Sequence, residues 1–230
     1  MLVKDWMTEN VVTVDIEGSM EDAIKLLKEN NIRMLPVLKK GRLAGIVTDR
    51  DLKRAQASDA TTLDIHELFY LLSKIKVGHV MSKNPLTVPP DFTIEETADL
   101  LLQHKISGAP VVDAEGEIAG VITKNDLFRA LISLSGFGKK GVQFAFLLED
   151  RPGSIKEVAD IIRTFGARMV SILSTYENAA EGYRKVFIRI YDIDRGEIGK
   201  LKEQLRASLK NDARMLYMVD HRDNTREIYA

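Results

Sequence analysis

The sequence predicts an α/β (α+β) fold in which two related α/β units are followed by a separate βαββαβ unit. Three observations support this prediction: an internal repeat, an alternation of short apolar strands with amphipathic helices in each copy, and a change of pattern after residue 135. The chain has 230 residues, of which 45% are hydrophobic and 29% are charged. This composition is ordinary for a globular protein with room for one or two domains.

An internal repeat organises the first part of the chain. Each matched position of the first copy returns in the second at an offset of 74 residues, which one inserted residue raises to 75 in the later part of the repeat. The matched pairs are Met7 and Met81, Ile32 and Ile106, Pro36 and Pro110, Gly45 and Gly120, Thr48 and Thr123, and Asp51 and Asp126. We therefore predict one repeat over residues 1–55 and a second over residues 77–135.

Each repeat is expected to form strand, helix, strand, turn, strand and helix. Ser19-Met20-Glu21-Asp22 and Thr93-Ile94-Glu95-Glu96 have the pattern of a capping box, in which a hydroxyl is followed three residues later by a carboxylate. Apolar residues at i, i+4 and i+7 follow both boxes and predict one buried helix face. A unit of this size buries little core alone, so we expect a pseudo-twofold pair with two related clefts.

The motif G-h-h-T-x-x-D, where h is an apolar residue, lies where the third expected strand of each repeat ends and the second expected helix begins. Thr48 and Thr123 stand at expected helix starts, where free backbone N–H groups and the helix dipole attract an anion. Asp51 and Asp126 each offer two acceptor oxygens, which suit two neighbouring hydroxyls. The same T-x-x-D spacing is also a helix cap that needs no ligand. Both interpretations stay open at this point.

The doubled Pro-Val and G-h-h-T-x-x-D motifs resemble a CBS domain pair, also called a Bateman module, over residues 1–130. This resemblance implies a sensor of adenosine-containing ligands such as AMP, ADP, ATP, NAD or S-adenosylmethionine. It also implies that the Thr contacts a phosphate and that the Asp holds the ribose diol. The candidate ligand-binding residues are Thr13, Arg33, Thr48, Arg50 and Asp51 in repeat 1, and Thr87, Ser107, Thr123, Lys124 and Asp126 in repeat 2.

The two copies differ in charge beside this motif. Asp49 and Arg50 of repeat 1 correspond to Lys124 and Asn125 of repeat 2. Arg50 and Lys124 are candidates for contacts with a second or third phosphate, since charged donors strengthen such bonds; they could equally be solvated charges at a helix start. We expect clefts that prefer different ligands, or one cleft in use. Gly45 and Gly120 are expected to let a ligand approach the backbone closely.

Two segments connect the predicted units. The connector, residues 56–76, contains an expected helix over residues 63–72, with an apolar face that packs in the core or contacts a second copy. The second connection, residues 136–141, is rich in Gly and Lys and predicts a flexible linker. It lacks the G-x-x-x-x-G-K-[ST] spacing of a phosphate-binding loop.

Residues 142–219 predict the element order βαββαβ, which is a ferredoxin-like split unit, and residues 220–230 are expected to form a tail. With Leu148-Glu149-Asp150-Arg151-Pro152-Gly153-Ser154-Ile155 in its first loop, this unit resembles an ACT domain. The resemblance implies an amino-acid effector loop at Asp150, Pro152 and Gly153, used at an interface between copies. Arg168 stands where many amino-acid-binding members have Asn, which favours dimerisation over effector binding.

The order CBS–CBS–ACT resembles the bacterial AcuB-type proteins of acetoin utilisation. It implies a regulatory protein, a homodimer, and a metabolic enzyme as a possible target of regulation.

Several classes of function are excluded or disfavoured by the composition. The chain has no cysteine, and its four histidines are scattered, so we expect no metal site. No catalytic motif is found, and we expect neither an enzyme nor a catalytic cofactor. A net charge of −1 disfavours nucleic-acid binding. Without a long apolar run or a secretory signal, a cytoplasmic protein without membrane contact is expected.

The sequence thus predicts a non-catalytic regulator that senses an adenosine-containing ligand in clefts between the repeats. The ACT-like unit would dimerise or bind a small effector. The alternative is an oligomeric interaction scaffold whose ligand sites are degenerate.

Overall fold

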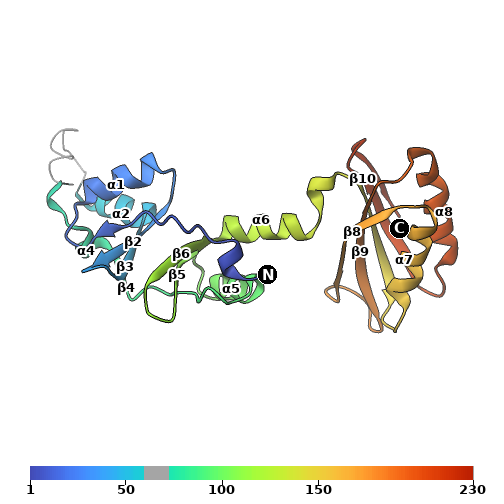
Figure 1. Ribbon diagram of the computed structural model, residues 1–230, viewed down its shortest axis with the longest axis horizontal. Helices are drawn as coiled ribbons and strands as arrows, with labels where there is room; N and C mark the ends of the chain where they lie inside the picture. Colours follow the sequence, from blue (N-terminus) through green and yellow to red (C-terminus); the bar gives the residue numbers. More distant parts are fainter. Residues whose placement is uncertain (60–72, 230) are drawn as a thin grey trace. The chain divides into compact units, whose positions relative to one another are not determined.

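The computed structural model describes residues 1–59 and 73–229 (Figure 1). The chain divides into two compact units, Met1–Ala130 and Leu131–Ala230. The helix expected over residues 63–72 lies outside the described residues. Within the described ranges, no helix is both long and apolar enough to cross a membrane.

Repeat 1 forms a small sheet with two helices. Its elements are β1 (Val14–Asp15), α1 (Met20–Glu29), β2 (Met34–Lys39), β3 (Arg42–Thr48) and α2 (Asp49–Asp59). The expected capping box is present: Asp22 N donates to Ser19 Oγ at 3.0 Å, and Ser19 N donates back to the Asp22 carboxylate. α1 therefore begins at Met20 and buries its apolar face against β2 and β3. The side chains in this core include Met20, Leu27, Leu35, Val37 and Val47.

Repeat 2 follows the same plan. Its elements are α4 (Val77–Val80), β4 (Ser82–Lys83), α5 (Ile94–Gln103), β5 (Gly108–Val112), β6 (Ile118–Thr123) and α6 (Lys124–Leu134). The second predicted capping box is also present, with Glu96 N donating to Thr93 Oγ1 at 3.1 Å. Hydrogen bonds from the backbone and side chain of Thr93 lower the pKa of Glu96. The core of this repeat includes Val88, Ile94, Leu101, Val111 and Ile122.

The segment in front of each repeat packs into the other repeat. Val3, in the short 3-10 helix η1 (Val3–Asp5), is fully buried in the core of repeat 2, and Thr8 pairs with Val121. Reciprocally, Val77 is fully buried in the core of repeat 1, and β4 pairs with β3. This exchange makes the two repeats one pseudo-twofold unit and extends the sheet of repeat 1 to the order β1-β2-β3-β4.

The exchange also explains the repeated glycines. A Cβ on Gly45 would lie 2.6 Å from Met81 Sδ, and a Cβ on Gly120 would lie 2.6 Å from Met7 Sδ. The expectation that these glycines let a ligand approach the backbone is therefore wrong. Both residues are buried, and their missing side chains make room for the exchanged methionine instead.

The second unit is a five-stranded antiparallel sheet covered by two helices. Its elements are β7 (Val142–Glu149), α7 (Ser154–Thr164), β8 (Arg168–Thr175), β9 (Tyr183–Tyr191), α8 (Ile198–Ser208), β10 (Arg214–Asp220) and β11 (Thr225–Ile228). The strand order β11-β10-β7-β9-β8 contains the ferredoxin-like βαββαβ arrangement in its last four strands. Figure 1 shows α7 and α8 on the same face of the sheet, over a core that includes Phe144, Phe146, Ile188 and Leu201.

Two short segments are more ordered than the sequence suggests. The tail contains β11, which pairs with β10 from Tyr217 to Asp220. The Gly- and Lys-rich segment contains the 3-10 helix η2 (Phe137–Lys139). The carbonyl oxygen of Ser135, just before it, accepts from Arg189 Nε at 2.8 Å and from Ser171 Oγ at 2.9 Å. Gly141, just after it, has no room for a Cβ, which would lie 1.7 Å from Ile190 O.

Candidate functional site

The first T-x-x-D motif lies where β3 ends and α2 begins. The backbone N and Oγ1 of Thr48 donate to Asp51 Oδ2 at 3.0 and 2.6 Å. Asp51 N donates in return to Thr48 Oγ1 at 3.3 Å. The pair is therefore a capping box, and it holds one oxygen of the carboxylate at the N-terminus of α2.

The second motif repeats this geometry at the start of α6. Thr123 N and Oγ1 donate to Asp126 Oδ2 at 2.9 and 2.6 Å. Both motifs therefore cap a helix, as one of the two interpretations of the sequence predicted. Capping and ligand binding do not exclude each other, because each carboxylate has a second oxygen.

The backbone register brings most of the other candidates of repeat 1 to the same end of the sheet. Thr48 pairs with Met34, the first residue of β2, and Asp49 N donates to Arg33 O at 3.2 Å. Arg50 is the second residue of α2, and its side chain is exposed. Arg33, Thr48, Arg50 and Asp51 therefore lie at the end of the sheet where β2 begins and β3 ends. Thr13 lies further along the sheet, because it directly precedes Val14 of β1, which pairs in parallel with Val37 in the middle of β2.

Repeat 2 gathers its candidates in the same way. Thr123 pairs with Gly108, and Lys124 N donates to Ser107 O at 2.9 Å. Thr87 precedes Val88, which bridges to Val111 in parallel. Ser107 is exposed and Lys124 is half-buried, whereas Asp126 is only 5% exposed.

One contact distinguishes Asp126 from Asp51. Arg129 Nη1 donates to Asp126 Oδ1 at 3.0 Å, so both oxygens of that carboxylate are occupied. The counterpart of Arg129 in repeat 1 is Arg54, which is exposed and forms no ion pair with Asp51. The i, i+3 spacing on a helix allows such a pair in both repeats, so the spacing does not predict which of the two forms.

A hollow of about 280 Å³ lies where the two repeats meet. Its lining includes Thr13, together with Glu9 and Val11 from the same segment, Leu38 from repeat 1, and Glu117 and Ile118 from repeat 2. Of the ten candidate ligand-binding residues, Thr13 is the one that lines this hollow. The Thr–Asp pairs lie outside it: Thr48, Asp51 and Thr123 are half-buried, and Asp126 is buried.

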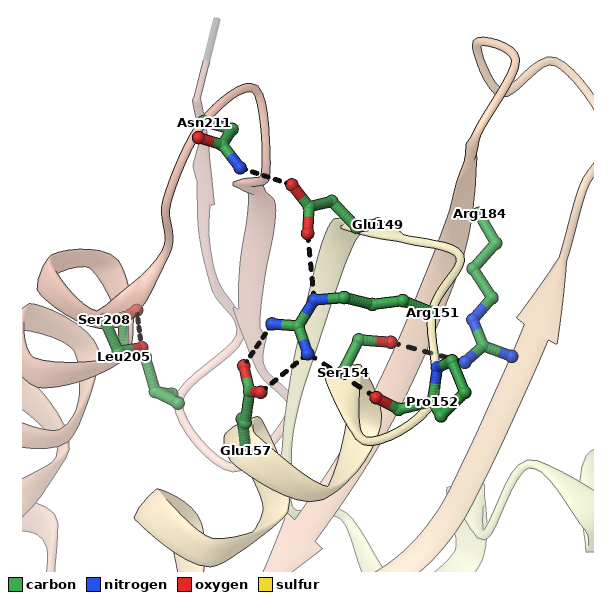
Figure 2. A network of polar contacts seen from close by, with 9 residues as sticks. All are labelled: Glu149, Arg151, Pro152, Ser154, Glu157, Arg184, Leu205, Ser208 and Asn211. Carbon is green, nitrogen blue, oxygen red and sulfur yellow. Dashed lines mark hydrogen bonds and ion pairs between the residues drawn. The ribbon is translucent and has the colours of Figure 1, made fainter.

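The predicted effector loop lies between β7 and α7 (Figure 2). Asp150 accepts from Tyr176 Oη at 3.4 Å and faces Arg184 Nε at 3.5 Å. Pro152 is exposed, and Gly153 has a φ of +88°, which favours glycine at this entry into α7. The three predicted loop residues therefore shape the turn.

Arg151, which the sequence analysis did not select, is the centre of the polar network in that loop. Figure 2 shows its guanidinium between two carboxylates: Nε donates to Glu149 at 2.9 Å, and the two terminal nitrogens donate to Glu157 at 2.8 Å each. A hydrogen bond from Asn211 and one from Arg151 lower the pKa of Glu149. All three nitrogens of the guanidinium thus donate to neighbouring carboxylates, and these bonds stabilise the turn. A hollow of about 150 Å³ lies beside the turn.

No cluster of His, Asp or Glu suited to a metal ion occurs in residues 1–59 and 73–229. His79 and His104 are exposed in the first unit, and His221 lies in the second.

Comparison with known proteins identifies relatives of the first unit. The family model described as "CBS domain" matches residues 3–58 and 77–133. A CBS domain-containing protein of Dictyostelium discoideum is 33% identical over 135 residues, which cover 58% of this chain and 93% of that protein.

Two solved structures extend the comparison. A protein from Vibrio cholerae described as an acetoin utilization protein (AcuB) is 29% identical with a TM-score of 0.51, over 61% of this chain and 97% of that chain. CBSX2 from Arabidopsis thaliana, crystallised in complex with AMP, is 33% identical with a TM-score of 0.48, over 57% of this chain and 96% of that chain.

Proposed function

The chain belongs to the family of CBS-domain proteins, and on that basis we propose that it is a regulatory protein whose paired repeats sense an adenosine-containing ligand. The observation that carries this proposal is the doubled Thr–Asp pair. In both repeats the Thr holds one carboxylate oxygen at 2.6 Å at the N-terminus of a helix. The Asp is thereby fixed in one orientation, as a ligand site requires.

The proposed contacts follow from the positions of the side chains. In repeat 1, Asp51 Oδ1 would accept from a ribose hydroxyl, while the N-terminus of α2 attracts a phosphate. Arg50 and Arg33 are exposed near that helix start and would neutralise further phosphate charge. In repeat 2, Lys124 would take this role. Thr13 and Thr87 would line the two clefts from the segments that precede the parallel strand pairs.

The ligand class is supported by sequence likeness. CBSX2, which is 33% identical, was crystallised with AMP. AMP is therefore the first ligand to test, followed by ATP, NAD and S-adenosylmethionine, which share the adenosine group. The ligand would act as an effector, and we propose neither a reaction nor a catalytic cofactor.

The second unit would carry the response. We assign it the role of an ACT domain that pairs two copies of the chain, with Asp150, Pro152 and Gly153 as the loop nearest a possible effector. Its ferredoxin-like strand order supports this assignment. To regulate a target, a nucleotide must bind two arrangements of the chain with different affinity. The likeness to AcuB makes an enzyme of acetoin metabolism the first partner to test.

A specific observation favours the alternative, an interaction scaffold without ligands. In both repeats the Thr and Asp of the motif bond to each other and cap the helix that follows. Caps of this kind would persist in a protein that uses its repeats only to assemble.

Isothermal titration of the full chain with AMP, ATP, NAD and S-adenosylmethionine tests the proposal. Asp51→Asn and Asp126→Asn should each weaken binding at one cleft, and the double variant should abolish it. Asp22→Asn is the matched control, because it disturbs a capping box at α1 that is outside the clefts. The proposal fails if none of the four ligands binds, or if the double variant binds like the wild type.

A further inference from the structure

Arg129 gives the carboxylate of repeat 2 a partner that the carboxylate of repeat 1 lacks. Asp126 Oδ2 is held by Thr123, and Asp126 Oδ1 accepts from Arg129 Nη1 at 3.0 Å. The Asp126 side chain is only 7% exposed, whereas that of Arg129 is 65% exposed. One of the two acceptor positions of Asp126 Oδ1 is therefore taken, and the arginine that takes it lies at the surface.

The same carboxylate oxygen is open in repeat 1. Asp51 Oδ2 is held by Thr48, but no hydrogen bond or ion pair from any described residue reaches Asp51 Oδ1. Arg54, the counterpart of Arg129, is not within ion-pair distance of Asp51. Lys53, its neighbour in sequence, instead pairs with Asp49 at 3.6 Å.

A ribose diol distinguishes between these two states. Its two hydroxyls donate hydrogen bonds, so they need a carboxylate oxygen with unused lone pairs. With Oδ2 held by the threonine in both repeats, Oδ1 is the oxygen left for the ribose. In repeat 1 both acceptor positions of this oxygen are open to the diol. In repeat 2 Arg129 takes one of them, so both hydroxyls can bind only after Arg129 is displaced.

We propose that Arg129 is a specificity-determining residue, which weakens the binding of a ribose in the repeat 2 cleft and makes repeat 1 the first cleft to fill. This inference rests on the proposed function, namely that the clefts bind adenosine-containing ligands. It adds the order in which the two clefts bind ligand, and it names the residue that determines this order.

The expected size of the effect is modest. An ion pair with one exposed partner is worth up to ~1 kcal/mol, so its displacement weakens adenosine binding at repeat 2 by about threefold to fivefold. A ligand with a phosphate gives the displaced guanidinium a new partner. The penalty is therefore smaller for AMP than for adenosine, and repeat 2 gains selectivity for phosphorylated ligands.

The test isolates each cleft in the full chain and uses adenosine as the probe. Titration of Asp51→Asn reports on repeat 2, and the added substitution Arg129→Gln should tighten adenosine binding about threefold to fivefold. The matched control reports on repeat 1: Asp126→Asn with and without Arg54→Gln should bind adenosine with the same affinity. With 2′-deoxyadenosine, which lacks half of the diol, the gain from Arg129→Gln should shrink.

The outcomes separate this inference from the proposed function. Unchanged or weaker adenosine binding after Arg129→Gln overturns the inference alone, and weaker binding would make Arg129 a ligand contact. Failure of adenosine and AMP to bind any variant or the wild type overturns both. Should Asp51→Asn not fold, a two-site titration of the wild type and of Arg129→Gln serves instead: two affinities should converge in the variant, and identical curves would overturn the inference.

Discussion

Repeat 1 and repeat 2 have the same capping boxes, the same exchanged segments and the same buried glycine, yet the surroundings of their Thr–Asp carboxylates differ. The shared features are packing and capping contacts: Gly45 and Gly120 each face a methionine, and Ser19 and Thr93 each cap a helix. The difference lies at the carboxylate, where Arg129 binds Asp126 and Arg54 does not bind Asp51. Duplication thus preserved the packing, while the charges around the clefts diverged.

The largest expected effect tests whether the two cores are equivalent. Leu27 and Leu101 occupy the same position in α1 and α5 and are 6% and 0% exposed. Leu27→Ala and Leu101→Ala should each lower the free energy of unfolding by about 2–5 kcal/mol, with the larger loss at Leu101. Denaturation in urea followed by circular dichroism measures both. A loss below about 1 kcal/mol at either site would show that the cores are not equally packed.

The next effect tests the reciprocal exchange of segments. Gly45→Ala and Gly120→Ala place a methyl group 2.6 Å from a methionine sulfur in both repeats, and near a backbone oxygen as well. Each should cost about 1–3 kcal/mol of stability, because the exchanged segment has to shift. Gly116→Ser is a comparison for a glycine with open space at its Cβ but a positive φ. Equal stability of the wild type and both alanine variants would contradict the packing described.

A smaller effect separates the two carboxylates in the absence of ligand. Asp126→Asn removes a charge that is buried and bonded to both Thr123 and Arg129, whereas Asp51→Asn removes one that is more exposed. We expect a loss of about 1–3 kcal/mol for Asp126→Asn and about 0.5–1 kcal/mol for Asp51→Asn. Thermal unfolding of the unliganded variants gives the order. The reverse order would show that Arg129 does not stabilise Asp126.

The smallest effect concerns pH and the cap of α5. Because bonds from Thr93 lower the pKa of Glu96 in the folded chain, this carboxylate contributes stability above its ordinary pKa. That contribution is lost as the pH falls through the lowered, folded-state pKa. Glu96→Gln should therefore remove a small part of the acid sensitivity between about pH 6 and pH 3. Parallel slopes of stability against pH in wild type and variant would count against it.

Much of the fold could be predicted because it depends on local and repeated patterns. Ser19 and Thr93 set helix starts through bonds to residues three positions away, and Phe144, Phe146 and Leu148 alternate as a strand should. The T-x-x-D pairs were found for the same reason. β11 was not found, since a short edge strand with polar residues has little pattern of its own.

The features that the sequence did not predict are non-local. The motif around Gly45 does not predict that Gly45 contacts Met81, because that contact depends on the exchange of segments. Likewise, Gly141 looks like a linker residue until its contact with Ile190 is known. Arg129 and Arg54 have the same spacing to their aspartates, so sequence alone could not show that one forms the pair and the other does not.

The exchanged segments also set an order of events during synthesis. Val3 donates its backbone N–H to Phe92 O, and Thr8 bonds with Val121, so Thr8 cannot reach its final partner until more than a hundred residues have followed it. At ~5–20 residues per second, the synthesis of the residues between Thr8 and Val121 takes on the order of ten seconds. Repeat 1 needs only the arrival of Val77 and β4. The nascent chain should therefore close its first repeat while its opening residues are still waiting for the second.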